Sequence, residues 1–148
     1  MTDYPWFKNY PEGIPHEIGN YEYNSLIEMF DSTCDRYSDR IAFENYGVKI
    51  TFKELHEKAT HFAAYLQGEL GLKKGDRIAI QMPNLLQFPV AFFGTIKAGL
   101  IAVNTNPLYT PPEMKHQFVD AEVSAVVIVA NFAQQLEVIQ NEIPAKHI

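Results

Sequence analysis

The first clear pattern in the chain is an apolar stripe with the spacing of a helix. Three of its members recur every four residues and therefore share one helical face: Leu26, Phe30 and Cys34. Ser25 followed by Glu28 is the signature of a capping box, which closes the first turn of a helix through reciprocal hydrogen bonds. The pattern predicts a helix that ends near Arg36 and buries Cys34 in the core.

Alternation of apolar and polar residues replaces the helical spacing from Ile41 onward. Residues 41–46 and 48–52 have the two-residue period of short strands, and Gly47 separates them. Two such segments joined by a glycine turn predict an antiparallel hairpin.

A longer helical stripe follows the hairpin and leads into another strand. Thr51 and Glu54 have the spacing of a capping box, which predicts the start of this helix, and Gly71 marks its end. The apolar positions with helical period are Phe52, Leu55, Ala59, Phe62, Ala63, Leu66 and Leu70. Residues 77–82 are then a short, largely apolar strand that Pro83 stops. A helix that leads into such a strand indicates a parallel, layered α/β fold.

The next helix has two alternative starts. Asn84 and Gln87 repeat the capping pattern, and residues 85–96 are apolar almost all round, which predicts a buried helix from residue 85. Pro89 would then lie in the second turn, where its missing N–H removes a backbone hydrogen bond, so the helix either kinks there or begins later. Gly99 is expected to end it, because glycine adopts the left-handed C-terminal conformation without steric penalty.

The stretch that follows combines a strand, a loop and a helix start. Residues 100–103 have the composition of a short buried strand. Residues 104–109 form a polar, proline-containing loop at its carboxyl end, the edge where open α/β sheets usually place ligands. Thr110 and Glu113 are another capping box, with proline at the first helical position, and this helix is expected to run to Ala121.

The last part of the chain continues the alternation of strands and helices. Residues 124–129 are the most convincing interior strand, Asn131 is expected to cap the next helix and Pro144 to end it, and residues 146–148 begin a further strand. The apolar positions of this helix are Phe132, Leu136 and Ile139. The order of elements predicts an α/β fold that is part of a doubly wound, largely parallel sheet with flanking helices. An extended N-terminal arm and a short β-hairpin precede this sheet.

We divide the chain into an arm, residues 1–23, and an incomplete N-terminal α/β subdomain, residues 24–148. The arm interleaves prolines with aromatic residues, so we expect it to be extended and without regular structure. Its aromatic residues are Tyr4, Trp6, Phe7, Tyr10, Tyr21 and Tyr23. These rings either lie against the domain's own surface or form an interfacial anchor or a subunit contact, because Trp and Tyr suit both settings.

Composition excludes several classes of protein. A net charge of -6 and a pI near 5.3 argue against non-specific nucleic-acid binding, which needs clustered Lys and Arg. Cys34 is the only cysteine among 148 residues, so neither an internal disulfide nor a cysteine-rich zinc site is available. No apolar run is long enough to cross a bilayer, and a cytoplasmic protein is therefore the default expectation.

Residues that perform chemistry are not evident in the sequence. Neither G-x-G-x-x-G nor G-x-x-x-x-G-K-[ST] occurs, and the glycines before residue 77 precede a strand instead of opening a helix. His56 and His61 are five apart on one helix and so point in different directions, while Glu113-x-x-His116 is a single motif where di-metal bundles need two. We therefore assign no catalytic, cofactor-binding or metal-binding residue to this chain.

Two motifs nevertheless carry a family resemblance. Ile50-Thr-Phe-Lys-Glu-Leu55 looks like the first core motif of the adenylate-forming (luciferase-like) superfamily, and the run from Ile96 to Pro107 looks like its second. Residues 108–114 and 6–15 are similar to the bacterial long-chain branch. The sequence thus resembles the N-terminal portion of long-chain fatty acyl-CoA synthetases (fatty-acid:CoA ligases).

The resemblance implies a function for a parent enzyme several times longer than this chain. Such enzymes convert ATP and a fatty acid, with Mg2+, to acyl-adenylate and pyrophosphate, and the thiol of coenzyme A then displaces AMP. The phosphate loop, the nucleotide contacts and the C-terminal lysine follow later in that family, so this fragment is expected to be scaffold, to bind no cofactor and to be inactive alone. The motif positions assigned to the scaffold are Thr51, Glu54, Lys97, Gly99, Asn104, Asn106 and Pro107.

Other interpretations stay open at this point. The chain could instead be a free-standing α/β interaction module without catalysis. For the parent enzyme, a cytoplasmic location is expected. Peripheral contact with the inner face of the membrane and a homodimer are further alternatives that the aromatic arm suggests.

Overall fold

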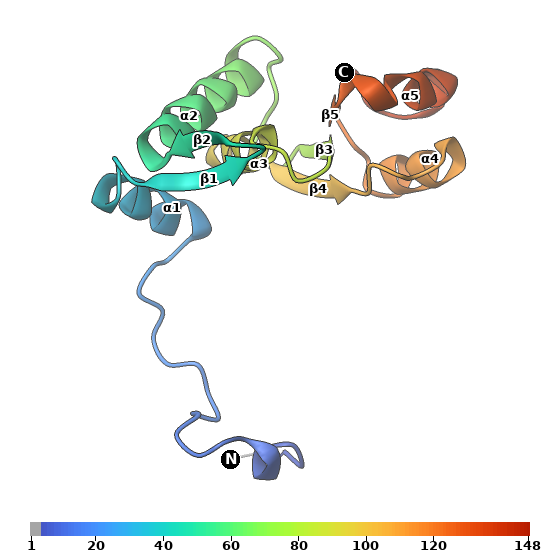
Figure 1. Ribbon diagram of the computed structural model, residues 1–148. Coiled ribbons are helices and arrows are strands. Elements are labelled where there is room, and N and C mark those ends of the chain that lie inside the picture. Colours follow the sequence, from blue (N-terminus) through green and yellow to red (C-terminus); the bar gives the residue numbers. More distant parts are fainter. Residues whose placement is uncertain (1–3) are drawn as a thin grey trace.

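The computed structural model describes residues 4–148, and within them a three-stranded parallel sheet with strand order β4-β3-β5 organises the fold (Figure 1). Its strands are β3 (Arg77–Gln81), β4 (Ile101–Thr105) and β5 (Ala125–Ile128). A separate antiparallel hairpin consists of β1 (Ile41–Asn45) and β2 (Val48–Thr51). The α/β fold class predicted from the sequence is confirmed.

Two layers of helices cover the parallel sheet. The first layer holds α2 (Phe52–Gly68) and α3 (Gln87–Lys97), and the second holds α4 (Pro111–Asp120) and α5 (Ala133–Ile139), as Figure 1 shows. The strands pack against both layers because successive side chains point to opposite faces of a sheet. Ile78 and Ile80 pack in the α2/α3 core, whereas Ala79 packs in the α4/α5 core. The remaining helix, α1 (Leu26–Arg36), forms a third apolar cluster with α2 and the hairpin, and this cluster includes Cys34 as predicted.

Of the capping boxes predicted for α1 and α2, the one at α2 is complete. The one at α1 is only half formed, because another donor binds its carboxylate. Thr51 and Glu54 form the reciprocal box at the start of α2. At α1, the Ser25 hydroxyl accepts from the Glu28 N–H at 3.1 Å, but the Glu28 carboxylate turns to Asn24, whose backbone and amide nitrogens lie 2.9 and 3.1 Å away. The second half of that predicted box is therefore wrong, because Asn24 offers two donors to the same carboxylate.

The later of the two predicted starts for α3 is correct. The helix begins at Gln87, so Pro89 is its third residue, where a backbone N–H would have no intrahelical acceptor in any case. The predicted cap at Asn84 is wrong, and its backbone carbonyl instead accepts a hydrogen bond from the Asn45 side chain at 3.1 Å. That bond ties the hairpin to the loop before α3.

Helices α2 and α3 approach each other at Gly94, which the sequence reasoning did not single out. A Cβ atom built on Gly94 would lie 2.8 Å from the Phe62 ring and 2.9 Å from the Ala59 carbonyl oxygen. Both distances are shorter than side chains tolerate, so the absence of a side chain at this position sets the separation of the two helices.

Gly99 ends α3 in the predicted left-handed conformation, with φ of +77°. Its N–H donates to the Ile96 carbonyl at 2.9 Å, and the Leu100 N–H donates to the Thr95 carbonyl at 3.1 Å. This pair of bonds is the Schellman motif, which satisfies helix carbonyls that would otherwise lack partners. The chain then enters β4 directly.

Three boundaries in the second half of the chain differ from the prediction. Strand β4 continues to Thr105, so Asn104 belongs to the strand and not to the loop. Asn131 lies inside the 3-10 turn Ala130–Phe132 that precedes α5, and it therefore does not cap that helix. Helix α5 ends at Ile139 and is followed by the 3-10 turn Gln140–Glu142, so Pro144 is not the residue that ends the helix. His147 forms a parallel bridge with Ala125, which agrees with the predicted start of a further strand.

The arm differs from its prediction in one respect, because part of it has regular structure. It contains a 3-10 turn at Phe7–Asn9, and Figure 1 shows residues 4–23 leading away from the sheet. The rings between residues 4 and 16 pack on one another. Phe7 stacks on His16 with ring centroids 4.0 Å apart, and Tyr4 stacks on Trp6 at 4.6 Å.

Replacing Gly99 with valine should destabilise the fold by about 1–2 kcal/mol or more, because any side chain at this positive φ is strained and a β-branched one most of all. Urea unfolding followed by circular dichroism measures the change. The matched control is Gly68→Ala at the end of α2, where an added Cβ meets nothing within 4 Å and φ is not positive. That variant should be neutral or more stable, and equal losses in both variants would contradict the role assigned to Gly99.

Candidate functional site

The carboxyl ends of the three parallel strands lie at one edge of the sheet. Gln81 at the end of β3 pairs with Thr105 of β4 on one side and with Ile128 of β5 on the other. In open α/β sheets this edge is where ligands bind. The loop 106–109 rises from the same edge and carries part of the second sequence motif.

Asn106 is the centre of this loop. Its side-chain oxygen accepts from the Leu108 N–H at 3.0 Å, which closes a tight Asx turn. Its backbone carbonyl accepts from the Tyr109 N–H at 3.1 Å and from Nε2 of Gln81 at 3.3 Å. The loop is therefore fixed by one residue that the sequence identified and one, Gln81, that it missed.

Asn104 contributes through its backbone. The amide of Gln117 in α4 donates to the Asn104 carbonyl at 3.2 Å, which fastens the end of β4 to the neighbouring helix. Pro107 follows Asn106 at the turn, and Leu108 beyond it is 77% exposed. The apolar side chain of Leu108 is thus free to meet a surface outside this chain.

Two carboxylates near motif positions are held by helix starts. Glu113 accepts from the Thr110 hydroxyl at 2.7 Å and from its N–H at 2.8 Å, and these bonds, the hydroxyl first, lower the pKa of Glu113. The Thr51 backbone N–H and then its hydroxyl lower the pKa of Glu54 in the same way. Both groups therefore stay ionised as hydrogen-bond acceptors and are poorly suited to donate a proton.

Lys97 joins a polar cluster among three helices. Its Nζ donates to Asp31 Oδ1 of α1 at 2.7 Å and lies 3.3 Å from His56 Nε2 of α2. His56 Nε2 is 3.1 Å from the same aspartate oxygen, so one carboxylate serves both nitrogens. The Lys97 side chain is 19% exposed, and the cluster lies over the third apolar core. Sequence reasoning placed Lys97 in a motif but could not pair it with residues 41 and 66 positions away.

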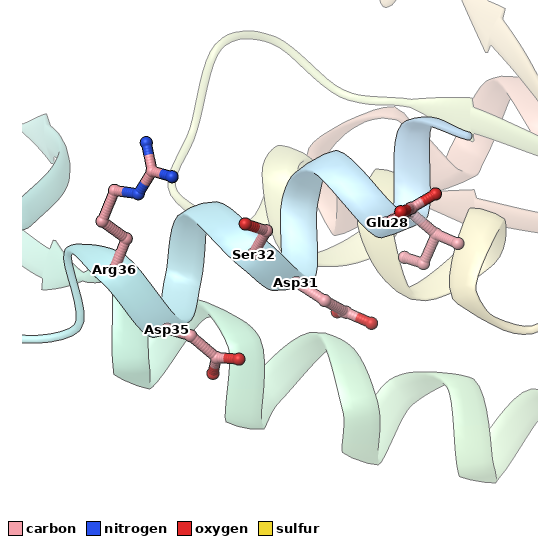
Figure 2. A pocket seen from close by; sticks show the side chains of 6 residues that line it. Glu28, Asp31, Ser32, Asp35 and Arg36 are labelled. Carbon is pink, nitrogen blue, oxygen red and sulfur yellow. The ribbon is translucent and has the colours of Figure 1, made fainter. Parts of the chain in front are cut away.

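A hollow of about 830 Å³ lies beside this cluster along α1. Figure 2 shows Glu28, Asp31, Ser32 and Asp35 projecting from successive turns of that one helix, with Arg36 at its end. No second element supplies a converging group to its lining, so the hollow is a helix surface and not a built site. Below it, burial first and then Asp31 and Asp35 raise the pKa of Cys34 to about 11, which keeps this core residue a thiol.

The described part of the chain contains neither a cluster of metal ligands nor a membrane-spanning helix. Between residues 4 and 148, no three His, Cys, Asp or Glu side chains gather in a way that could hold a metal ion. In the same part of the chain, every helix is too short or too polar to span a bilayer.

Comparison with known proteins places these features in a family. A family model described as "AMP-binding enzyme" matches residues 30–147. The long-chain-fatty-acid–CoA ligase of Escherichia coli O6:H1 is 52% identical over 97% of this chain, and that of Bacillus subtilis is 40% identical over 83%. The match covers 26% and 22% of those proteins, so the chain spans about a quarter of the length of the curated relatives it matches.

Solved structures agree with the sequence matches. A fatty acyl CoA synthetase from Mycobacterium tuberculosis superposes with a TM-score of 0.76 at 25% identity, covering 82% of this chain and 25% of that one. The sheet and its two helix layers therefore have the arrangement found in an enzyme of that kind.

Replacing Asp31 with asparagine should lower the stability of the chain by about 1 kcal/mol. The change replaces the negatively charged acceptor that Lys97 and His56 share with a neutral amide oxygen, which binds Lys97 more weakly. Solvent screens part of the loss because Asp31 is 41% exposed. The matched control is Glu44→Gln, which removes a hairpin ion pair with Lys49 whose side chains are both more than half exposed. That control should be neutral in urea unfolding. A neutral Asp31→Asn would contradict a stabilising role for the cluster.

Proposed function

Because this chain belongs to the AMP-binding enzyme family, we propose that it is part of a fatty-acid:CoA ligase that acts on long-chain fatty acids. In the proposed reaction the fatty-acid carboxylate displaces pyrophosphate from ATP to give an acyl-adenylate. The thiol of coenzyme A then attacks the acyl carbon, and AMP leaves. The observation that carries the proposal is the 52% identity to a long-chain-fatty-acid–CoA ligase over nearly the whole chain.

Within that enzyme we propose a scaffold role for this chain. The contacts of its motif residues support such a role because they are made inside the chain. Glu54 closes a helix start with Thr51, and Lys97 bonds to Asp31. Gly99 turns the chain into β4, while Asn106 shapes the loop at the edge of the sheet. The division into an arm, residues 1–23, and an incomplete subdomain, residues 24–148, belongs to the same proposal.

ATP, coenzyme A and Mg2+ are proposed for the whole ligase and not for these residues. A phosphate-binding loop of either glycine-rich type is missing from the sequence, and the described residues offer no cluster of metal ligands. We therefore assign no step of the reaction to a side chain of this chain.

An ATP–pyrophosphate exchange assay with palmitate and Mg2+ tests the proposal. The product of the complete open reading frame that contains this sequence should exchange pyrophosphate in a palmitate-dependent manner, and residues 1–148 alone should not. Circular dichroism on the same sample of residues 1–148 verifies that it is folded. Exchange by residues 1–148 alone would overturn the scaffold role. An open reading frame that ends at Ile148 would favour the free-standing interaction module.

We further propose that the ligase is cytoplasmic and that the arm mediates contact with the inner face of the membrane or with a second copy in a homodimer. The exposure of its rings supports this proposal. Trp6 is 51% exposed and Tyr21 is 77% exposed, and Trp and Tyr are the side chains that suit interfaces with one apolar and one aqueous side.

Deleting residues 1–15 from the complete protein should weaken binding to phosphatidylcholine vesicles or shift sedimentation toward the monomer. The matched control is Tyr46→Asn, which removes an aromatic ring that is 96% exposed at the turn of the hairpin, outside the arm. Asparagine suits the positive φ of that position, so the control should retain wild-type behaviour. Unchanged vesicle binding together with unchanged sedimentation in the deletion would reject the proposed contact.

A further inference from the structure

We propose that Gln81 is a positioning residue that holds the loop 106–109 at the edge of the sheet, at the expense of core stability. Gln81 is the last residue of β3 and is completely buried, in a strand whose preceding residues Ile78, Ala79 and Ile80 are apolar and also fully buried. A polar amide in such a place calls for a specific reason, because burying it costs free energy unless both ends are hydrogen-bonded.

The amide nitrogen of Gln81 makes a specific hydrogen bond to the loop. Nε2 donates to the Asn106 carbonyl at 3.3 Å, across 25 residues of sequence. The same carbonyl accepts from the Tyr109 N–H, and the Asn106 side chain accepts from the Leu108 N–H. Gln81 therefore links the central strand to the one residue on which the internal bonds of the loop converge.

The amide oxygen of Gln81, in contrast, makes no hydrogen bond to the described part of the chain. Oε1 of Gln81 is buried and has no hydrogen-bond partner among residues 4–148. An unpaired buried acceptor lowers stability, and an apolar side chain of similar shape would remove that cost. Core packing alone would thus favour methionine at this position, whereas holding the loop requires an N–H donor.

The benefit assigned to this arrangement rests on the proposed function, since the loop lies at the edge where a ligase of this fold would meet its ligands. The hydrogen bond itself can be tested without any activity. Failure of the positioning role is therefore distinguishable from failure of the ligase assignment.

The test compares Gln81→Met with the wild-type chain by NMR-detected amide hydrogen exchange and by thermal unfolding. Methionine keeps the volume but removes both the donor and the unpaired acceptor. The Leu108 and Tyr109 amides should exchange about two- to tenfold faster than in the wild type, the factor that corresponds to one hydrogen bond. The Ile80 and Val103 amides of the sheet should not share this acceleration, and the Tm should be unchanged or higher.

Thr95→Val is the matched control. Thr95 is also completely buried and its hydroxyl is likewise unpartnered within residues 4–148, but it lies in α3, on the other side of the sheet. This variant should leave the exchange of Leu108 and Tyr109 unchanged. The proposal is overturned if Gln81→Met leaves loop exchange unchanged, if the sheet amides accelerate equally, or if its Tm falls.

Discussion

Burial of residues 78–81 of strand β3 is the constraint on which the rest of the α/β unit depends. Ile78, Ala79 and Ile80 have no solvent exposure, and both edges of the strand are paired, with β4 on one side and β5 on the other. A strand in this position must be apolar on both faces, which is the pattern of parallel sheets covered by helices. Each helix layer then takes its place from the face that it covers, α2 and α3 against the two isoleucines and α4 and α5 against the alanine.

Two glycines adjust the first helix layer to this strand. Gly94 lets α2 and α3 come close enough for the Phe62 ring to pack beside the backbone of α3. Gly99 then reverses the chain so that its own carbonyl accepts from the Gly75 N–H at 3.0 Å, while the Ile101 N–H reaches the Asp76 carbonyl at 2.8 Å. Those bonds fix where β4 begins relative to β3. The way in which α3 ends therefore determines the register between β3 and β4. This register in turn determines where the loop after β4 lies relative to the end of β3.

Features encoded by neighbouring residues were predictable from the sequence, and features that depend on packing were not. The capping box of Thr51 and Glu54 depends only on two residues three apart in the sequence. The left-handed conformation of Gly99 depends only on the residue type at that position. The caps expected at Asn84 and Asn131 have the same local signals. Neither residue caps a helix in the structure. Asn84 instead accepts a hydrogen bond from the hairpin through its carbonyl, and Asn131 lies within a 3-10 turn.

In the candidate site, too, local contacts were predictable and long-range contacts were not. Asn106 was recognised as part of a motif, and its bond to Leu108 is local. The partner of its carbonyl, Gln81, lies 25 residues earlier in the chain. Nothing in the apolar run of β3 distinguishes a positioning amide from any other polar residue at a strand end. The cluster of Lys97 with Asp31 and His56 likewise joins three helices whose mutual placement the sequence does not specify.

These contacts explain how a stretch can identify a family without performing its chemistry. The side chains of Glu54, Lys97 and Asn106 all bond to groups within the chain, and these bonds hold a helix start, helix packing and a turn. Catalytic groups must instead direct unpaired donors or acceptors at a substrate. The motif therefore specifies the shape of one sheet edge, and we infer that the reacting groups of the proposed ligase are supplied to that edge from outside this chain.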